Sequence, residues 1–431
     1  MTYRPIYHFA PSFGWMNDPN GLCQFNGVYH LFYQYHPFGV NWDDMHWGHA
    51  TSTDLIRWEH KPIALRPGDD YDRDGIFSGS ALIKDDMLHL YYTGNTWLDE
   101  KRETLRQVQC LATSIDGLSF QKSVHNPLIS EIPEHGNAHV RDPKVWADND
   151  KFYMILGTRD ELNGKVVLYE SDDALHWREQ GIMAEGTGEH GWMWECPDLF
   201  TLNGHDVLLL SPQGMEPTGD RYHNLHQCGY FIGKFDVTTT QFTHGSFSEL
   251  DYGHDFYAAQ TFLDDQGRRI LIAWNAMWEQ DWPEQREGWT NQMTIPRELS
   301  IRNNRLWMTP IEEMKWLRQC SFPLESSFFS GKAFELEFDV QGAFQFSCFQ
   351  GTATLSVAKG YIQLVRNKTE RRIQANCERV RLFIDSSSIE IFVNDGEYVF
   401  SSRIYPVNHT LQHHLTGNIS NIMYHSFESG E

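Results

Sequence analysis

The chain lacks the features by which several large protein classes are usually identified. Its 431 residues hold 35 basic and 58 acidic side chains, a net charge of −23, and contain no basic stretch. Such a chain is poorly suited to follow a phosphate backbone, so nucleic acid is not expected as a partner. No apolar run approaches the roughly eighteen residues that cross a bilayer, and Met1 to Pro5 starts no apolar leader segment. We therefore predict a cytoplasmic protein without a membrane partner.

Motifs for disulfides and metals are missing as well. Seven cysteines are scattered through the chain without a CxxC pair, a pattern that favours reduced thiols over a disulfide framework or a zinc site. His46 and His49 are accompanied by no HExxH motif, and the acidic run from Asp69 to Asp74 departs from the spacing of a calcium-binding loop. We predict no metal and no cofactor, and we expect the acidic run to be a solvated loop near a pocket rim.

Helical periodicity is scarce, and Pro310 to Gln319 is the best candidate for a helix. A turn followed by an aliphatic and aromatic run recurs instead, starting at Gly27, Asp86, Asp150, Gly204 and Gly267. The starts lie 59, 64, 54 and 63 residues apart. This period leaves room for about four short strands, the content of a propeller blade. Five units predict five blades.

A second recurrence has the form S-x-D-x-x-x-aromatic, at Ser52 to Trp58, Ser114 to Phe120 and Ser171 to Trp177. The short aspartate can close a turn by accepting backbone amides, so we interpret these motifs as structural. Beyond about Phe322 the chain changes to short alternating strands with a hairpin turn at Asn394-Asp395-Gly396. The predicted fold is all-β: a five-bladed β-propeller at 1–309, a linker helix at 310–321 and a β-sandwich at 322–431.

Three short acidic segments are the most informative part of the sequence. They are WMNDPNG at 15–21, RDP at 141–143 and WECPD at 194–198. Each sets a carboxylate beside a proline or glycine and among aromatic residues, where a sharp turn can hold it rigidly at a strand end. A glycosidase needs one ionised and one protonated carboxyl group, so dispersed acids among tryptophans favour sugar chemistry.

Together with FSGS at 77–80, these segments closely resemble glycoside hydrolase family 32, the invertases and related β-fructofuranosidases. MHWGHATS at 45–52, GHDFYAAQ at 253–260 and SSRIYP at 401–406 extend the resemblance over nearly the whole chain. Within the family the sequence is most similar to intracellular bacterial sucrose and sucrose-6-phosphate hydrolases. The resemblance implies a five-bladed propeller followed by a β-sandwich, in agreement with the count of repeats.

The resemblance also assigns roles to the acids. It implies that Asp18 is the nucleophile, Glu195 the general acid and base, and Asp142 the stabiliser that grips the fructose hydroxyls. We expect turn amides to keep Asp18 ionised, and we expect a hydrophobic, acid-crowded pocket to keep Glu195 protonated near neutral pH. That apolar surround would include Trp192, Trp194 and Cys196. A retaining mechanism predicts that the carboxyl groups of Asp18 and Glu195 lie about 5–5.5 Å apart.

Further contacts to fructose follow from the matching motifs. Amide, hydroxyl, guanidinium and aromatic groups would hold and wall the sugar, and the residues concerned are Asn17, Gln34, Trp42, Phe77, Ser78, Arg141, Tyr257 and Trp274. The polar members Asn17, Gln34 and Ser78 are equally compatible with ordinary turn or ladder hydrogen bonds.

Several alternatives stay open at this point. The enzyme could hydrolyse sucrose, sucrose-6-phosphate or short fructo-oligosaccharides, it could transfer fructose to a sugar acceptor, or the propeller could bind sugar without catalysis. A phosphate-selective site should present basic groups beside the glucose pocket, and the possible donors are Arg159, Lys165, Arg221, His223 and Arg286. A monomer and a homodimer are both compatible with the sequence.

Overall fold

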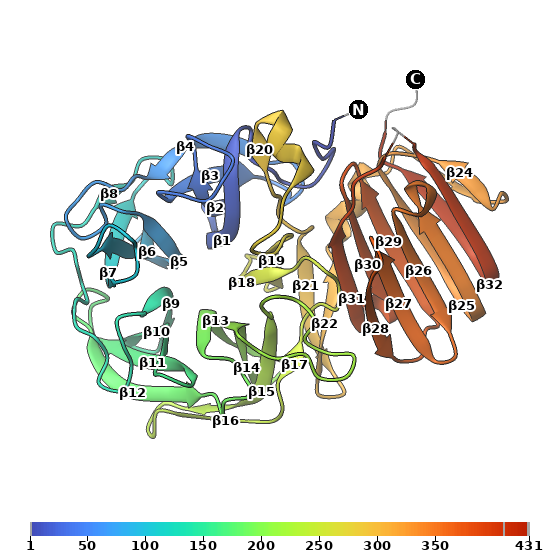
Figure 1. The fold of residues 1–431 in the computed structure, drawn as a ribbon. Coiled ribbons are helices and arrows are strands. Elements are labelled where there is room, and N and C mark those ends of the chain that lie inside the picture. The colour runs from blue at the N-terminus through green and yellow to red at the C-terminus, as the bar shows by residue number, and fades with distance from the viewer. Residues whose placement is uncertain (1, 408–409, 429–431) are drawn as a thin grey trace.

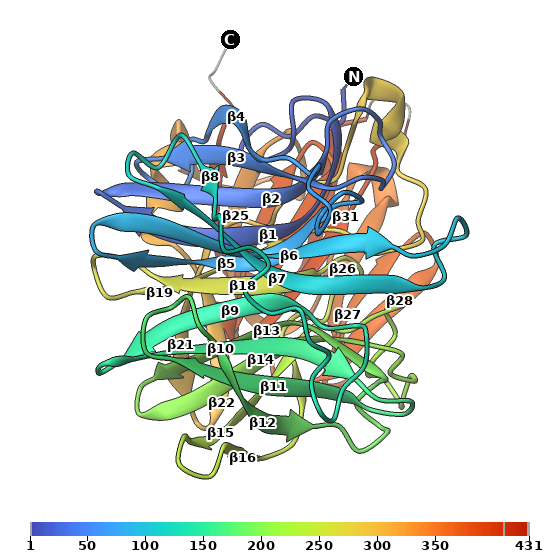
Figure 2. The same ribbon diagram turned by 90° about the vertical axis from the view of Figure 1, so that its left-hand side faces the viewer.

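The structure is a computed structural model that describes residues 2–407 and 410–428. It contains a ring of five sheets, arranged around a central axis, and a second β-domain beside the ring (Figure 1). Figure 2 views the same ring from its side. The predicted five-bladed propeller and the predicted C-terminal β-sandwich are both confirmed. The helices among the described residues are short 3-10 helices, and none is long and apolar enough to cross a membrane.

The blades are numbered I to V in chain order, and each consists of antiparallel strands. The strands of blades I and II are β1 (Gly14–Phe25), β2 (Val28–His36), β3 (His46–Ser52), β4 (Glu59–Leu65), β5 (Ile76–Lys84), β6 (Met87–Trp97), β7 (Leu105–Ser114) and β8 (Gln121–Lys122). Those of blade III are β9 (Arg141–Asp148), β10 (Lys151–Arg159), β11 (Gly164–Ser171) and β12 (Arg178–Glu185). Those of blades IV and V are β13 (Met193–Leu202), β14 (His205–Gln213), β15 (Gly229–Asp236), β16 (Gln241–His244), β17 (Ser248–Glu249), β18 (Tyr257–Leu263), β19 (Arg269–Trp274), β21 (Arg297–Arg302) and β22 (Arg305–Pro310).

The five runs predicted from the sequence are the second strands of the five blades, namely β2, β6, β10, β14 and β19. A second strand has a neighbour on each side within its blade and faces the adjoining blades, so it is buried along most of its length, as β14 shows. Continuous burial explains why these strands give a run of apolar residues, the strongest signal in each repeat.

The S-x-D-x-x-x-aromatic motifs form the turns that leave the third strands of blades I to III. In the first, Asp54 Oδ1 accepts the backbone N–H groups of Ile56 at 2.9 Å and Arg57 at 2.7 Å. Asp116 and Asp173 each accept two amides in the same way. The structural interpretation of these motifs is therefore confirmed.

The ring is closed by the connection between β19 and β21. This connection contains the 3-10 helix η1 (Pro283–Glu287) and the short strand β20 (Trp289–Thr290), which pairs in parallel with β1 of blade I. Blade V is thereby joined directly to blade I. The segment predicted as a linker helix contains only the six-residue 3-10 helix η2 (Glu312–Leu317), which has no side-chain cap at its start.

The C-terminal domain is a sandwich built around two long strands, β25 (Phe334–Cys348) and β32 (Gln412–Ser426), which pair along most of their length. The first half of β25 pairs with β29 (Arg379–Asp385), and its second half pairs with β26 (Ala353–Ala358). Two layers therefore diverge from one strand pair, and the residues of both share one hydrophobic core.

The remaining strands extend these layers. From β29 one layer continues through β30 (Ser388–Val393) to β31 (Tyr398–Arg403). From β26 the other layer continues through β27 (Tyr361–Arg366) to β28 (Thr369–Gln374). Two short strands, β23 (Cys320–Pro323) and β24 (Phe328–Ser330), pair with β32. Two 3-10 helices lie in connections, η3 (Phe349–Gly351) and η4 (Asn394–Gly396), and the second is the predicted hairpin turn.

Buried charged groups join the propeller to the sandwich. Arg297 of β21 lies 3.1 Å from Asp251 and 2.6 Å from Glu390 of β30, and His8 lies 2.8 Å from both Glu390 and Asp385. All five side chains have an exposed fraction of 0%. Partners of opposite charge surround each group, so breaking one pair would leave an uncompensated charge in the interface.

Candidate active site

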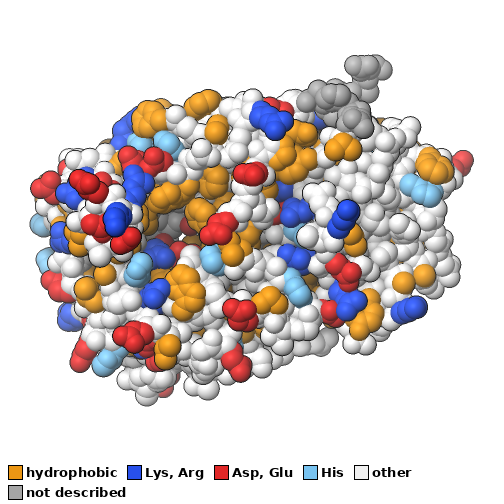
Figure 3. Space-filling view, viewed as in Figure 1, with side chains coloured by type: hydrophobic (Ala, Val, Ile, Leu, Met, Phe, Trp, Pro, Cys, Tyr) orange, Lys and Arg blue, Asp and Glu red, His pale blue; other side chains and the backbone are white. Residues whose placement is uncertain are grey.

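The five innermost strands, β1, β5, β9, β13 and β18, each have an irregular register close to their first residues. A bulge bends a strand and redirects a side chain out of the regular alternation. Here the bulges lie next to one cavity of about 230 Å³ between the blades, and Figure 3 shows this ring of blades hollowed at its centre. Asp18, Asp142 and Glu195 all line that cavity.

Prolines make these bulges compatible with a sheet. Pro19 and Pro143 directly follow Asp18 and Asp142, and Pro197 lies two residues after Glu195. Proline cannot donate to a ladder hydrogen bond. Asp142 and Cys196 adopt positive φ angles of 66° and 48°, a region that side chains other than glycine rarely occupy. The acids are therefore held in position by local backbone geometry and not by flexible loops.

Asp18 lies on β1 and is 9% exposed. Its carboxylate accepts hydrogen bonds from Ser78 Oγ at 2.6 Å and Asn17 Nδ2 at 3.0 Å, and Cys196 Sγ lies 3.6 Å away. Burial raises the pKa of Asp18 to about 6, because the loss of water and the charge of Glu195 outweigh these hydrogen bonds. The expectation that turn amides keep the pKa of Asp18 low does not agree with this environment, since its donors are side chains.

Asp142 lies at the start of β9 and is 4% exposed. Its Oδ2 accepts the backbone N–H of Cys196 at 2.9 Å, and its own N–H donates to Thr93 Oγ1 at 3.0 Å. Burial raises the pKa of Asp142 to about 7, opposed by Arg141 and reinforced by the other two acids. Cys196 thus contacts both aspartates and is covalently joined to Glu195, so one residue ties the three acids together.

Glu195 lies on β13 in a polar environment. Arg141 donates to its Oε1 through Nε at 3.1 Å and Nη2 at 2.8 Å, while Tyr257 and Gln213 donate to its Oε2 at 2.5 and 2.7 Å. Burial raises the pKa of Glu195, but the positive charge of Arg141 and the hydroxyl of Tyr257 outweigh it and lower the pKa overall. The structure therefore favours an ionised Glu195, whereas the sequence led us to expect a protonated one.

The predicted apolar surround of Glu195 is largely elsewhere. Trp194 is fully buried in the core between blades III and IV and donates to the carbonyl of His190, so it faces away from the cavity. Trp192 is 38% exposed and lies under the guanidinium group of Arg159. Alternation along β13 accounts for Trp194, which precedes Glu195 and points to the other side of the strand. Cys196, at the bulge, is the one predicted member that stays beside the acids.

The predicted sugar-binding residues divide into two groups. Asn17, Gln34, Trp42, Phe77, Ser78 and Arg141 line the cavity with the three acids. Gln34 Nε2 donates to the carbonyl of Ile76 at 2.9 Å, and the rings of Trp42 and Phe77 meet edge to face at 6.0 Å.

The other two predicted residues lie behind the cavity wall. Tyr257 reaches the site through its hydrogen bond to Glu195, and its hydroxyl also lies 3.0 Å from the carbonyl of Ser211. Trp274 is fully buried and packs against Trp278, which lines the cavity. Both residues therefore contact the wall or an acid, and the cavity lining does not include them.

Several lining residues carried no recognisable signal in the sequence. Gln107 lies on β7 and accepts hydrogen bonds from the Val140 N–H at 3.1 Å and from Arg141 Nη1 at 3.2 Å. Trp97, Leu105, His139 and Trp278 also line the cavity. They come from second and third strands or from loops, where residues far apart in sequence are brought together only by the closed ring. The tryptophan-rich stretch 274–278 was the one hint for Trp278.

Of the five basic residues considered for a phosphate, Arg159 is close to the cavity. Burial and the charges of Arg141 and Arg159 lower the pKa of the lining residue His139 to about 4, although Arg159 itself is not part of the cavity lining. Lys165 is paired with Asp160 at 2.8 Å, Arg221 with Glu249 at 3.2 Å, and the ring of His223 lies 2.9 Å from the Gly219 carbonyl. These three, like Arg286 within η1, are not part of the cavity lining.

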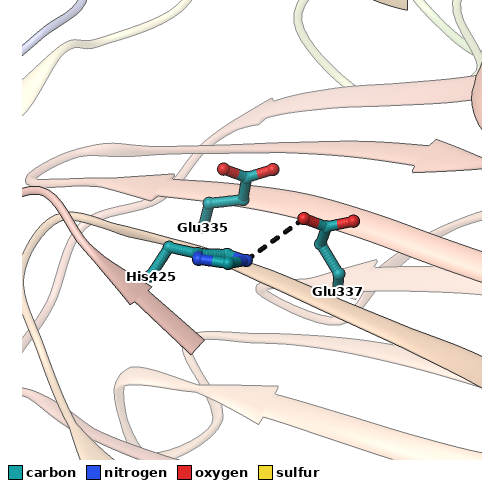
Figure 4. A group of neighbouring side chains, drawn as sticks. All are labelled: Glu335, Glu337 and His425. Atoms are coloured by element: carbon teal, nitrogen blue, oxygen red, sulfur yellow. Dashed lines mark hydrogen bonds and ion pairs between the residues drawn. The ribbon is translucent and has the colours of Figure 1, made fainter. Parts of the chain in front are cut away.

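Within the part of the chain that the structure describes, one group of potential metal ligands lies in the sandwich, formed by Glu335, Glu337 and His425 (Figure 4). Arginines already occupy the carboxylates: Arg318 bonds both glutamates at 2.8 and 2.6 Å, Arg379 bonds Glu337 at 2.8 Å, and Arg381 bonds Glu335. These cations satisfy the charge that a metal would otherwise neutralise, so the donor set does not fit a metal site.

The other residues considered for metals have protein partners. His49 is fully buried, and its ring stacks on Phe32 and lies 3.0 Å from a nitrogen of His30. Asp72 is also fully buried. Its carboxylate accepts a hydrogen bond from the Asp69 N–H at 3.0 Å and forms an ion pair with Lys122 at 2.6 Å. The expectation of a solvated acidic loop is therefore wrong for Asp72, which closes its own turn.

Comparison with known proteins gives matches over nearly the whole chain. Residues 8–310 match the Glycosyl hydrolases family 32 N-terminal domain, and residues 321–426 match the Glycosyl hydrolases family 32 C terminal domain. Sucrose-6-phosphate hydrolases of Escherichia coli and Bacillus subtilis are 42% and 41% identical; the first alignment covers 94% of this chain and 90% of the relative, the second 96% and 92%. A Bombyx mori GH32 β-fructofuranosidase mutant solved in complex with sucrose is similar, with a TM-score of 0.90 and 37% identity over 98% of this chain and 94% of that one.

Proposed function

Because the chain belongs to glycosyl hydrolase family 32, as a glycoside hydrolase of its sucrose-6-phosphate hydrolase and invertase group, we propose that it is a retaining β-fructofuranosidase. The observation that carries the proposal is the meeting of Asp18, Asp142 and Glu195 around one cavity, tied together by Cys196. A nucleophile, a proton donor and a group that binds sugar hydroxyls are the components of such a reaction.

In the proposed first step, Asp18 attacks C2 of the fructofuranosyl unit. A bond forms between C2 and a carboxylate oxygen of Asp18, the bond from C2 to the glycosidic oxygen breaks, and Glu195 gives that oxygen its proton. In the second step, ionised Glu195 removes a proton from water, the water oxygen bonds to C2, and the ester to Asp18 breaks. Asp142 accepts hydrogen bonds from the fructose hydroxyls in both steps. The mechanism predicts a separation of about 5–5.5 Å between the two reacting carboxyl groups.

Substrate binding must shift a proton for this mechanism to operate. Before substrate binds, the pKa of Glu195 is lowered by Arg141 and Tyr257, while those of Asp18 and Asp142 are raised. We propose that the arriving glycosidic oxygen displaces one Arg141 hydrogen bond from Glu195 and that sugar hydroxyls donate to Asp142. Both changes favour a proton on Glu195 and negative charge on the aspartates.

The substrate we propose is sucrose or its 6-phosphate, with Arg159 and His139 on the side of the leaving glucose. Relatives named sucrose-6-phosphate hydrolase and raffinose invertase support this substrate class. We also propose a cytoplasmic location, because all seven cysteines are free thiols, as is usual in a reducing compartment. For the oligomeric state, we propose either a monomer or a homodimer.

The experiment that tests the proposal compares kcat/KM for sucrose, sucrose-6-phosphate and kestose on the purified protein. Asp18→Asn and Glu195→Gln should each lower the rate by about 10²-fold or more without unfolding the protein, since each removes a group needed in the transition state. Near-normal activity in either variant would refute the assignment. The ratio of free fructose to oligosaccharide at high sucrose concentration separates hydrolysis from fructosyl transfer.

A further inference from the structure

The inner strands of the propeller connect the catalytic cavity to a second, larger cavity. This distal cavity has a volume of about 710 Å³, and the inner strands contribute residues 22–24, 81–83, 144–148, 199–201 and 261–263 to it. Four inner strands, β1, β5, β9 and β13, therefore line the catalytic cavity near their beginnings and the distal cavity near their ends, while β18 lines the distal cavity and reaches the catalytic site through Tyr257. Cys23 lies five residues beyond Asp18 on β1, which at ~3.3 Å per residue separates the two sites by about 16 Å.

Arg269 is the unusual residue of the distal cavity. It lines the cavity, has no ion pair within residues 2–407 and 410–428, and its Nε is buried without a hydrogen-bond partner. The neighbouring Arg268, in contrast, pairs with Asp264 and Glu313 at 2.8 Å each. The guanidinium group of Arg269 lies 4.8 Å from the centre of the Phe200 ring, which fixes its plane against the cavity wall.

Other donors face the same space. Thr261 lines the cavity, is 1% exposed, and its Oγ1 is buried without a partner among the described residues. Lys144 Nζ donates to Asp198 at 3.0 Å and to the Thr261 carbonyl at 2.6 Å, and an ammonium group has one further proton to give. Asp198 attracts the Arg269 guanidinium without forming an ion pair with it. A guanidinium N–H and a hydroxyl that are buried without partners each cost stability unless a ligand or water satisfies them.

The remaining wall is suited to the body of a small ligand. Trp146 is half-buried and lines the cavity, and the ring of Tyr153 stacks on it at 5.6 Å between ring centres. The cavity volume falls within the range of about 300–1,000 Å³ that is typical of small-molecule sites. Apolar side chains such as Leu82 share the wall with the charged residues Asp148, Asp206 and Lys234, of which Asp206 and Lys234 pair with each other at 3.1 Å.

We propose that the distal cavity binds a small anionic sugar, with its phosphate or carboxylate group on Arg269 and its ring against Trp146. Guanidinium pairs with both kinds of oxyanion through parallel N–H donors, and Lys144 and Thr261 supply further hydrogen bonds. The indole ring offers a flat apolar surface to one face of a sugar ring. This site is separate from the catalytic cavity, and its existence does not depend on the proposed activity.

The test uses three probes with the same ring: glucose, glucuronate and glucose 6-phosphate. The protein is labelled with 5-fluorotryptophan, and the fluorine resonance of Trp146 is assigned by its absence from the Trp146→Phe variant. We expect a saturable shift of this resonance with at least one of the two anions and none with glucose; whichever anion binds identifies the charged group. A response to glucose equal to that of the anions, or no saturable response to either anion, overturns the proposal.

Variants of Arg269 provide the second arm of the test. Arg269→Gln should weaken binding about tenfold or more, because a charge-assisted contact is lost, whereas Arg269→Lys keeps the charge and should retain most of the affinity. The matched control is Arg302→Gln, since Arg302 also lies over an aromatic ring, Trp307 at 4.5 Å, but is exposed and outside the cavity. Unchanged binding in Arg269→Gln, or equal loss in Arg269→Lys, overturns the role of the charge. Turnover of sucrose should stay within about twofold of the parent in Arg269→Gln.

Discussion

Replacing Asp18 by Asn should stabilise the folded protein at neutral pH while removing its activity. Burial and the charge of Glu195 raise the pKa of Asp18 from 3.8 to about 6. At about 1.4 kcal/mol for each pH unit, a rise of this size corresponds to about 3 kcal/mol against the ionised form in the folded state. An amide of the same shape carries no charge, so this cost disappears in the variant.

The sign of the pH dependence follows from the raised pKa. The protonated carboxyl of Asp18 is favoured in the folded state, so the stability linked to it is complete below pH 3.8 and is lost as pH rises through about 6. The advantage of Asp18→Asn over the parent should therefore be small near pH 4.5 and largest, about 3 kcal/mol, near pH 8. Paired thermal melts of both proteins across this range measure the difference directly.

A second buried aspartate serves as the control. Hydrogen bonds and charge from His8 and from backbone amides outweigh burial and lower the pKa of Asp385, so ionised Asp385 stabilises the folded state. Asp385→Asn should lower the melting temperature at pH 8, and this loss should shrink as pH falls below about 4. The reasoning is refuted if Asp18→Asn melts at or below the parent at pH 8, or if its advantage is the same at every pH.

Three further substitutions test the site. Ser78→Ala removes the 2.6 Å hydrogen bond that favours ionised Asp18, so the acid limb of the pH profile of kcat should move to higher pH by about 1–2 units. An acid limb that does not move contradicts the assignment of Asp18 as the nucleophile. Tyr257→Phe removes the 2.5 Å hydrogen bond to Glu195, so the alkaline limb of the pH profile of kcat should move to higher pH by about 1–2 units. A fall in kcat without movement of this limb argues against Glu195 as the general acid. Arg159→Gln should raise KM for sucrose-6-phosphate about tenfold and leave KM for sucrose unchanged, and steady-state kinetics with equal effects on both would exclude a phosphate contact.

Local signals in the sequence were sufficient for the architecture. The second strands of the blades are buried on both sides and therefore appear as apolar runs. The turn aspartates, such as Asp54, accept hydrogen bonds from backbone amides two and three residues further along the chain. Both kinds of signal depend on short stretches of chain. The linker is different: residues 310–321 have a helical pattern, but an uncapped segment anchored by buried Met314 forms only a 3-10 turn.

The site shows where sequence reasoning reaches its limit. The three acids were recognisable because each lies in a motif, whereas Gln107 becomes a site residue through a contact across blades and Gln213 through a contact from the neighbouring strand. The ionisation of Glu195 was misjudged for the same reason: its environment is set by Arg141 from another blade and not by neighbouring tryptophans. Burial of Asp72 likewise depends on Lys122, fifty residues away.

The most direct test of the mechanism is to locate the covalent intermediate. Glu195→Gln treated with β-fructofuranosyl fluoride, whose leaving group needs no proton, should form the fructosyl ester and hydrolyse it slowly, because the general base is missing. Peptide mapping by mass spectrometry after rapid quenching should then find fructose attached to Asp18. An adduct on Asp142, or turnover of the fluoride with inversion at C2 and no adduct, would contradict the account.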